Sequence, residues 1–202
     1  MVNVTMARLT SLTIWFTIGR SSVELFNGFR FPVLVLFELH IRSSWDFSWD
    51  NPEHFYDQLR SLRTFTFIGA AEDLVEFLPH TPSLIYLHAS IDPSIEPLLI
   101  GLMAMNGSNT LVPKLKHLEI HPYEERTASP ATIGPLLTMV ASRTKPHHAS
   151  PCPLEYLAVV IPEMELDGED DSFDLERQLH ACGMSRTEDN EFIVSHVWRG
   201  AS

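Results

Sequence analysis

One short apolar phrase recurs six times along the chain, and this recurrence constrains the fold more than any other sequence feature. The phrase is an apolar residue, two variable residues, an apolar residue, one variable residue and an apolar residue. The middle apolar residues fall at 12, 39, 65, 87, 118 and 157, so the steps are 27, 26, 22, 31 and 39 residues. Leucine-rich repeats run about 20–29 residues, so three steps fit that class and two require insertions. The copies begin at Leu9, Leu36, Leu62, Leu84, Leu115 and Leu154.

Helical patterns separate the copies. Apolar residues recur at helical spacing within 55–59, 74–78, 95–103 and 133–140. Proline introduces four of the copies and suits the entry to a strand, because it lacks a backbone donor; these are Pro32, Pro82, Pro113 and Pro153. The alternation predicts an α/β fold: a right-handed leucine-rich-repeat solenoid of about six irregular repeats, with a curved parallel sheet and outer helices.

The predicted domain has three parts. Residues 1–162 hold the irregular repeats, 163–172 form an acidic loop, and 173–202 form a C-terminal helix and a closing strand of the same domain. The closing strand is indicated by alternation over 192–198. No comparable cap precedes Leu9, so we expect the first strand to lie at a bare sheet edge. The chain would then lack an upstream segment or borrow a cap from a partner.

Charge argues against two classes of partner. The formal net charge is −12, and the 14 basic residues are scattered. Nucleic acids and anionic membranes are bound by clustered Lys and Arg, so we expect neither as a partner. The acidic segment is interpreted as a solvated loop, and a calcium site is the less favoured alternative.

The cysteines and the apolar runs predict an intracellular protein. Cys152 and Cys182 stand thirty positions apart without a CxxC pair, which favours reduced thiols. No run reaches the roughly 18 apolar residues that span a bilayer. The stretch from Leu9 to Ile18 alternates like a strand and is interpreted as one, not as a signal sequence. The predicted location is the cytoplasm or the nucleus.

The amino-acid pattern of the copies resembles the irregular leucine-rich region of F-box proteins, particularly those of mushroom-forming fungi. A helix, then Thr-Pro or Cys-Pro, then L-x-x-L recurs over roughly residues 9–160. The resemblance implies substrate recognition for a ubiquitin ligase. The F-box itself, which binds the ligase adaptor, is not visible, so adaptor binding is expected only through an upstream F-box. The segments that carry the resemblance are 31–32, 77–87, 112–120 and 152–157.

The variable positions inside each copy point onto the concave face of the predicted sheet, because side chains alternate along a strand. Stacking of the copies predicts Tyr86 beside His117 beside Tyr156, and His88 beside Glu119. Such an aromatic patch with hydrogen-bonding groups is typical of a protein-binding surface. The alternative is a set of ordinary exposed strand residues. The candidate protein-binding residues on this face are Glu38, His40, Tyr86, His88, His117, Glu119 and Tyr156.

A second candidate is the loop after the second copy, where Trp45, Phe47 and Trp49 place three aromatic residues in five positions. Trp45 and Trp49 are candidate partner anchors, because exposed aromatic residues lower solubility unless they meet a partner. Packing against the protein's own surface is the alternative.

No catalytic, cofactor or metal site is predicted. The chain has neither a G-x-S-x-G nor a G-x-x-x-x-G-K motif. His88, His117 and His121 could approach one another near Glu119, but they form no recognisable ligand motif. We therefore expect a protein-binding module without enzymatic activity. The alternatives are a small α/β enzyme without a recognisable motif, or a repeat fragment with no function of its own.

Overall fold

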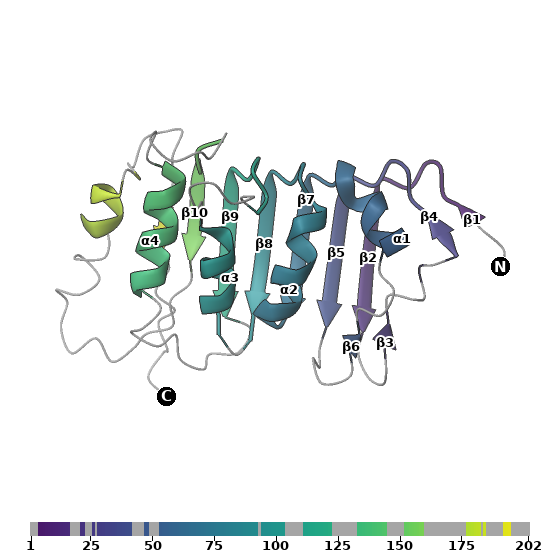
Figure 1. Ribbon diagram of the computed structural model, residues 1–202, viewed down its shortest axis with the longest axis horizontal. Helices are drawn as coiled ribbons and strands as arrows, with labels where there is room; N and C mark the ends of the chain where they lie inside the picture. The colour runs from purple at the N-terminus through teal and green to yellow at the C-terminus, as the bar shows by residue number, and fades with distance from the viewer. Residues whose placement is uncertain are drawn as a thin grey trace, which may run out of the picture.

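The seven-stranded parallel sheet is the centre of the structure. The computed structural model describes residues 4–16, 21–22, 26, 28–41, 47–48, 53–92, 94–103, 111–122, 133–144, 152–159, 177–182, 184 and 192–194. The sheet has the order β11-β10-β9-β8-β7-β5-β2, and its neighbours are parallel (Figure 1). Its strands are β2 (Ser11–Phe16), β5 (Leu36–Ile41), β7 (Thr64–Gly69), β8 (Tyr86–Ile91), β9 (His117–Pro122), β10 (Tyr156–Val159) and β11 (Phe192–Val194).

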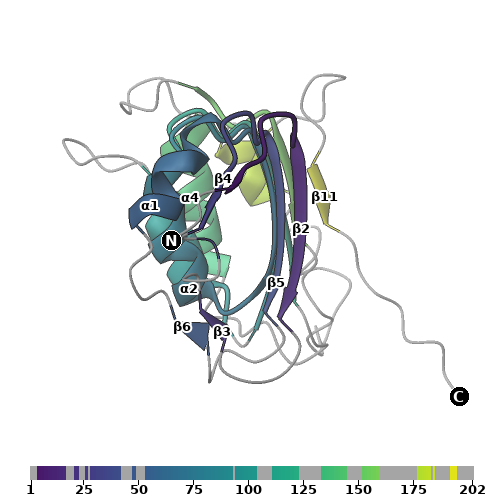
Figure 2. The same ribbon diagram turned by 90° about the vertical axis from the view of Figure 1, so that its right-hand side faces the viewer.

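The helices form a second layer that covers one face of the sheet (Figure 2). Helices α2, α3 and α4 lie in a row, each in contact with the next. The described helices are α1 (Glu53–Tyr56), the 3-10 helix η3 (Asp57–Ser61), α2 (Ala71–Phe77), the 3-10 helix η4 (Leu78–His80), α3 (Glu96–Leu102), α4 (Ile133–Thr144) and helical residues 177–181. Two small parallel pairs lie beside these layers: β1 (Val4–Thr5) with β4 (Phe29–Arg30), and β3 (Ser21–Ser22) with β6 (Phe47–Ser48).

The predicted α/β class, with its parallel sheet and a layer of helices, is therefore confirmed. Each expected strand and each helical segment is present, and the phrases lie on neighbouring strands. Within the segment predicted as a closing strand, Phe192–Val194 forms β11, which pairs with β10. The acidic segment 163–172 and both tryptophans of the predicted anchoring loop, Trp45 and Trp49, lie outside the described residues.

Five copies of the phrase begin with a tight turn. The amide of the first apolar residue donates to the carbonyl three residues earlier in five copies, for example from Leu62 to Leu59 and from Leu84 to Thr81. In the turns that end at Leu34, Leu84 and Leu115, proline occupies the second position, where its fixed φ angle suits a turn. The first apolar side chain is buried at 2% exposure or less in five copies, namely Leu34, Leu62, Leu84, Leu115 and Leu154.

The structure shows that the second copy of the phrase begins two residues earlier in the sequence than predicted. Phe37, not Leu39, pairs with Leu12 of β2 and Phe65 of β7. The copy therefore begins at Leu34, and Leu36 lies on the sheet face opposite the core. The error has a simple cause, because the segment 34–41 contains two overlapping matches to the phrase. A shift of two residues preserves the face of every side chain, so Glu38 and His40 stay on the predicted face.

Between sheet and helices lies an apolar core rich in phenylalanine. Phe65 stacks on Phe37 at 5.5 Å and on Phe77 of α2 at 4.3 Å between ring centroids. Phe55 of α1 meets Phe37 edge-on at 5.7 Å. These rings are at most 1% exposed, and they join strands to the helices that follow them.

The edge of the sheet at β2 is less covered. Leu12, Ile14 and Phe16 are half-buried, whereas the residues paired with them on inner strands are buried. Residues 4–8 are exposed, and Val4–Thr5 pairs with β4 instead of with β2. The described part of the chain therefore leaves β2 as the last strand of the sheet, as the sequence predicts.

A buried arginine joins the C-terminal half of the helix layer to the turn before β9. Arg143, in the last turn of α4, is 2% exposed. Its guanidinium donates to the carbonyls of Leu102 at 2.8 Å, Leu111 at 2.6 Å and Val112 at 3.1 Å. Burial lowers the pKa of Arg143 to about 10, so the group still carries its charge at neutral pH.

We predict that Arg143→Met lowers the free energy of unfolding by about 3 kcal/mol, because buried carbonyls lose a charged donor while the apolar stem is kept. Urea unfolding followed by circular dichroism measures the change. Arg60→Met is the control: Arg60 forms an exposed pair with Asp57 at 2.9 Å, which contributes at most about 1 kcal/mol. Equal stability of the two variants would contradict this role of Arg143.

Candidate functional site

The sheet face turned away from the helices carries the predicted binding residues, and we call it the open face. Its side chains form rows across the strands because parallel pairing places equivalent positions side by side. Every described open-face residue of β7, β8 and β9 is half-buried, which leaves part of each side chain accessible.

The first row is aromatic. Tyr86, His117 and Tyr156 occupy paired positions on β8, β9 and β10. The ring of His117 lies 5.8 Å from that of Tyr86 and 5.8 Å from that of Tyr156, measured between centroids. The predicted order of these three residues is confirmed.

The second row centres on Glu119. His88 pairs with Glu119 in the register of β8 and β9, as predicted, and its Nδ1 donates to Glu119 Oε2 at 2.8 Å. The hydroxyl of Tyr86 donates to the other oxygen, Glu119 Oε1. Burial raises the pKa of Glu119, but these two hydrogen bonds and the electrostatic influence of His88 and His121 together outweigh burial and hold the pKa below its usual value of 4.5. Burial and the hydrogen bond to Glu119 raise the pKa of Tyr86, so its hydroxyl remains a donor.

The third row adds His121. Its ring stacks on His88 with 4.8 Å between centroids and 24° between planes. Burial lowers the pKa of His121 below 6.5, with a further contribution from the neighbouring His88. The imidazole of His121 is therefore mostly neutral at neutral pH.

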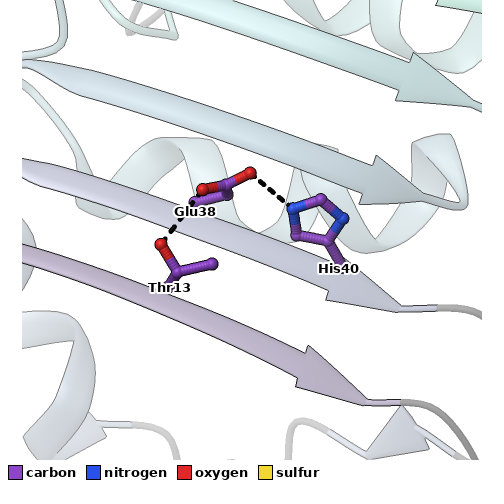
Figure 3. Close-up of polar contacts among 3 residues, drawn as sticks. All are labelled: Thr13, Glu38 and His40. Carbon is purple, nitrogen blue, oxygen red and sulfur yellow. Dashed lines mark hydrogen bonds and ion pairs between the residues drawn. The ribbon is translucent and has the colours of Figure 1, made fainter.

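A second cluster lies near the β2 edge (Figure 3). Glu38 accepts hydrogen bonds from Thr13 at 3.0 Å and from His40 Nε2 at 2.6 Å. The bond from His40 is the main reason that the pKa of Glu38 lies below 4.5, while burial opposes the shift. The ring of Trp15 stacks on His40 at 3.7 Å.

Sequence reasoning missed Trp15. This residue is 63% exposed and presents the largest exposed aromatic surface among the described residues. It lies one position past Ile14, the last residue of the first copy, and open-face positions were predicted only inside the copies. The alternation that places Ser11 and Thr13 on the open face also places Trp15 there, because the strand predicted over residues 9–18 continues past the copy.

The structure thus divides the predicted site residues into two groups. Tyr86, His88, His117, Glu119 and Tyr156 form one continuous patch over β8, β9 and β10. Glu38 and His40 form the separate cluster near β2, two strands away from β8. A further polar contact borders the patch, where Lys116 Nζ lies 2.5 Å from Glu155 Oε1.

Comparison with known proteins gives no match to a protein-family model, to a characterised protein or to a solved structure. Within the described parts of the chain, no helix has the length and apolar character needed to span a bilayer.

We predict that Glu119→Gln lowers the free energy of unfolding by about 1–2 kcal/mol at pH 7, because two donors lose a charged acceptor. The folded state lowers the pKa of Glu119, so the stabilisation is present above the unfolded pKa and is lost as the pH falls through the folded pKa. The difference from the wild type should therefore shrink as the pH falls below 4.5, the usual pKa of the group. Urea unfolding at several pH values in metal-free buffer measures it.

The control for this prediction is Glu76→Gln, at an exposed position on α2, which should change stability by less than about 0.5 kcal/mol. A Glu119→Gln difference that stays constant from neutral to acidic pH would contradict the proposed role of the carboxylate charge.

Proposed function

We propose that this chain is a leucine-rich-repeat module that binds a protein on its open face and does not catalyse a reaction. The proposal treats the row of strands and outer helices as a solenoid of about six irregular repeats. Repeat proteins of this kind use an extended sheet face for binding, because each repeat adds one strand to a continuous surface.

The aromatic row of Tyr86, His117 and Tyr156 is the observation that carries the proposal. Tyrosine is enriched among residues that dominate binding energy, because it buries a large rigid ring and offers a hydroxyl. The hydrogen bond from Tyr86 to Glu119 fixes the Tyr86 side chain before a partner arrives, which reduces the entropy lost on binding. Trp15, stacked on His40, supplies a second aromatic contact near the β2 edge.

We further propose that the bound protein is a substrate of an F-box-type ubiquitin ligase. The support is the resemblance in sequence to the leucine-rich region of fungal F-box proteins, together with the helix, Thr-Pro turn and strand order around Leu84. In this proposal the ligase adaptor binds only through an upstream F-box, and neither nucleic acid nor membrane is a partner. The expected location is the cytoplasm or the nucleus.

We predict that replacing Tyr86, His117 and Tyr156 together with serine reduces partner binding at least about tenfold, because the loss of several interface anchors costs 2 kcal/mol or more. The wild-type chain and the triple variant are compared as baits in cell extract by quantitative mass spectrometry. Circular dichroism and thermal melting confirm that the variant is folded.

The matched control is Ile100→Ser, which removes an apolar side chain that is 48% exposed on α3 in the helix layer. Partner proteins that depend on the open face should remain bound to this variant. A partner retained by the triple variant, or lost with Ile100→Ser, would contradict binding at the open face.

The ligase part of the proposal has its own test. Fusing an F-box to the N-terminus should allow reconstituted ligase to ubiquitylate the captured protein, and the triple variant of the same fusion should not. Failure to ubiquitylate a protein that binds tightly would overturn the ligase assignment and leave protein binding intact.

A further inference from the structure

Three possible metal ligands converge on the open face. His88, Glu119 and His121 each offer one ligand atom, and these atoms lie within 4.8 Å of one another. The register pairs His88 with Glu119 and Ser90 with His121, so alternation places all three side chains on one face. Each of them is half-buried, so the cluster is accessible to an ion from solution.

The chemistry of the three groups matches a divalent transition metal. Two imidazoles and one carboxylate form a combination that zinc enzymes use, and such sites leave one position open. Zinc binds nitrogen and oxygen ligands at about 2.0–2.2 Å, which places tetrahedral ligand atoms about 3.4 Å apart. His88 Nδ1 and Glu119 Oε2 are already 2.8 Å apart, and a zinc ion bound by both takes the place of the Nδ1 proton, so that the ring carries its proton on Nε2 instead.

Only side-chain rotation is needed to complete the geometry. The rings of His88 and His121 lie nearly parallel, with 24° between their planes, so one ring must turn before both nitrogens face the same point. His88 and His121 lie on neighbouring strands whose register the sheet fixes, so rotation about side-chain bonds is the movement that we propose.

Tyr86 supplies the outer contact that metal-binding carboxylates usually have. Its hydroxyl donates to Glu119 Oε1, which leaves Oε2 directed toward His88. Contacts of this type orient a ligand and typically change metal affinity about 10–100-fold. The cluster therefore has a ligand set and a residue that positions it.

We propose that His88, Glu119 and His121 bind one zinc ion on the open face, with Tyr86 positioning the carboxylate. The fourth coordination position points away from the sheet, where a water molecule or a side chain of a bound protein completes the shell. This site differs from the expectation that the sequence supports, which is no metal. It does not depend on the proposed binding function.

Titration of the metal-free protein with zinc chloride, in competition with a chromophoric chelator, tests the proposal. We expect one ion per chain in the wild type. His88→Gln, Glu119→Gln and His121→Gln should each weaken binding about 100-fold or more, whereas Tyr86→Phe keeps all three ligands and should weaken it about tenfold.

Two control variants separate this site from other histidines. His117→Gln changes an open-face residue outside the cluster and should leave zinc affinity within about twofold. The double variant His147→Gln and His148→Gln removes the adjacent histidine pair of the sequence and should also leave it unchanged. Affinity that is lost in the double variant but kept in His121→Gln overturns the proposal, as does the absence of stoichiometric binding to the wild type.

X-ray absorption of the zinc-loaded wild-type protein gives a readout that needs no variant to fold. Two imidazole ligands and additional oxygen ligands support the proposal. A shell with sulfur, or with no imidazole or only one, overturns it.

Discussion

In each of the first five copies of the phrase, one backbone carbonyl accepts two amides of the next copy, where the pairing of their strands begins. The carbonyl of Arg63, for example, accepts the amides of Ile85 and Tyr86 at 2.9 and 3.0 Å. The same double acceptance recurs at Thr10, Val35, Ile85 and Lys116, so five carbonyls set the alignment of six copies. These bonds fix the register in which neighbouring strands begin to pair. Equivalent side chains therefore lie side by side in rows on both faces of the sheet.

The core and the open face depend on this alignment in different ways. On the core side it brings Phe37, Phe65 and Phe77 into stacking distance, and burial of these rings stabilises strand against helix. Near α4 the spacing is less regular, and a charged residue, Arg143, satisfies carbonyls where an apolar side chain could not. The buried, charged Arg143 thus lies in the longest sequence interval between two copies of the phrase, which runs from residue 118 to residue 157.

On the open face, this alignment brings side chains of separate strands into contact with one another. Glu119 receives hydrogen bonds from Tyr86 and His88, which belong to the neighbouring strand and are more than thirty residues away in sequence. The same contacts support both proposals made above. They fix aromatic side chains for protein binding, and they orient a carboxylate between two imidazoles.

The sequence by itself determined the strands, the helices between them and the face on which each variable residue lies. Periodicity carries this information, because alternation assigns a face whatever the neighbours are. A shift of two residues leaves this periodicity unchanged. The second copy was therefore assigned to begin at Leu36 instead of Leu34, although Glu38 and His40 were assigned to the correct face. It also predicted the pairing of Tyr86 with His117 and of His88 with Glu119, because equal positions in stacked copies become neighbours.

Only the tertiary structure decided the features that depend on exact distances between strands and on packing between helices. The stacking of Trp15 on His40, the burial of Arg143 and the convergence of His88, Glu119 and His121 are examples. Arginine near the end of a helix is ordinarily exposed, and nothing in its local sequence announces three buried carbonyls. The cluster of His88, Glu119 and His121 likewise has no local sequence motif. Its ligands come from two strands, and the register between those strands brings them within reach of one ion.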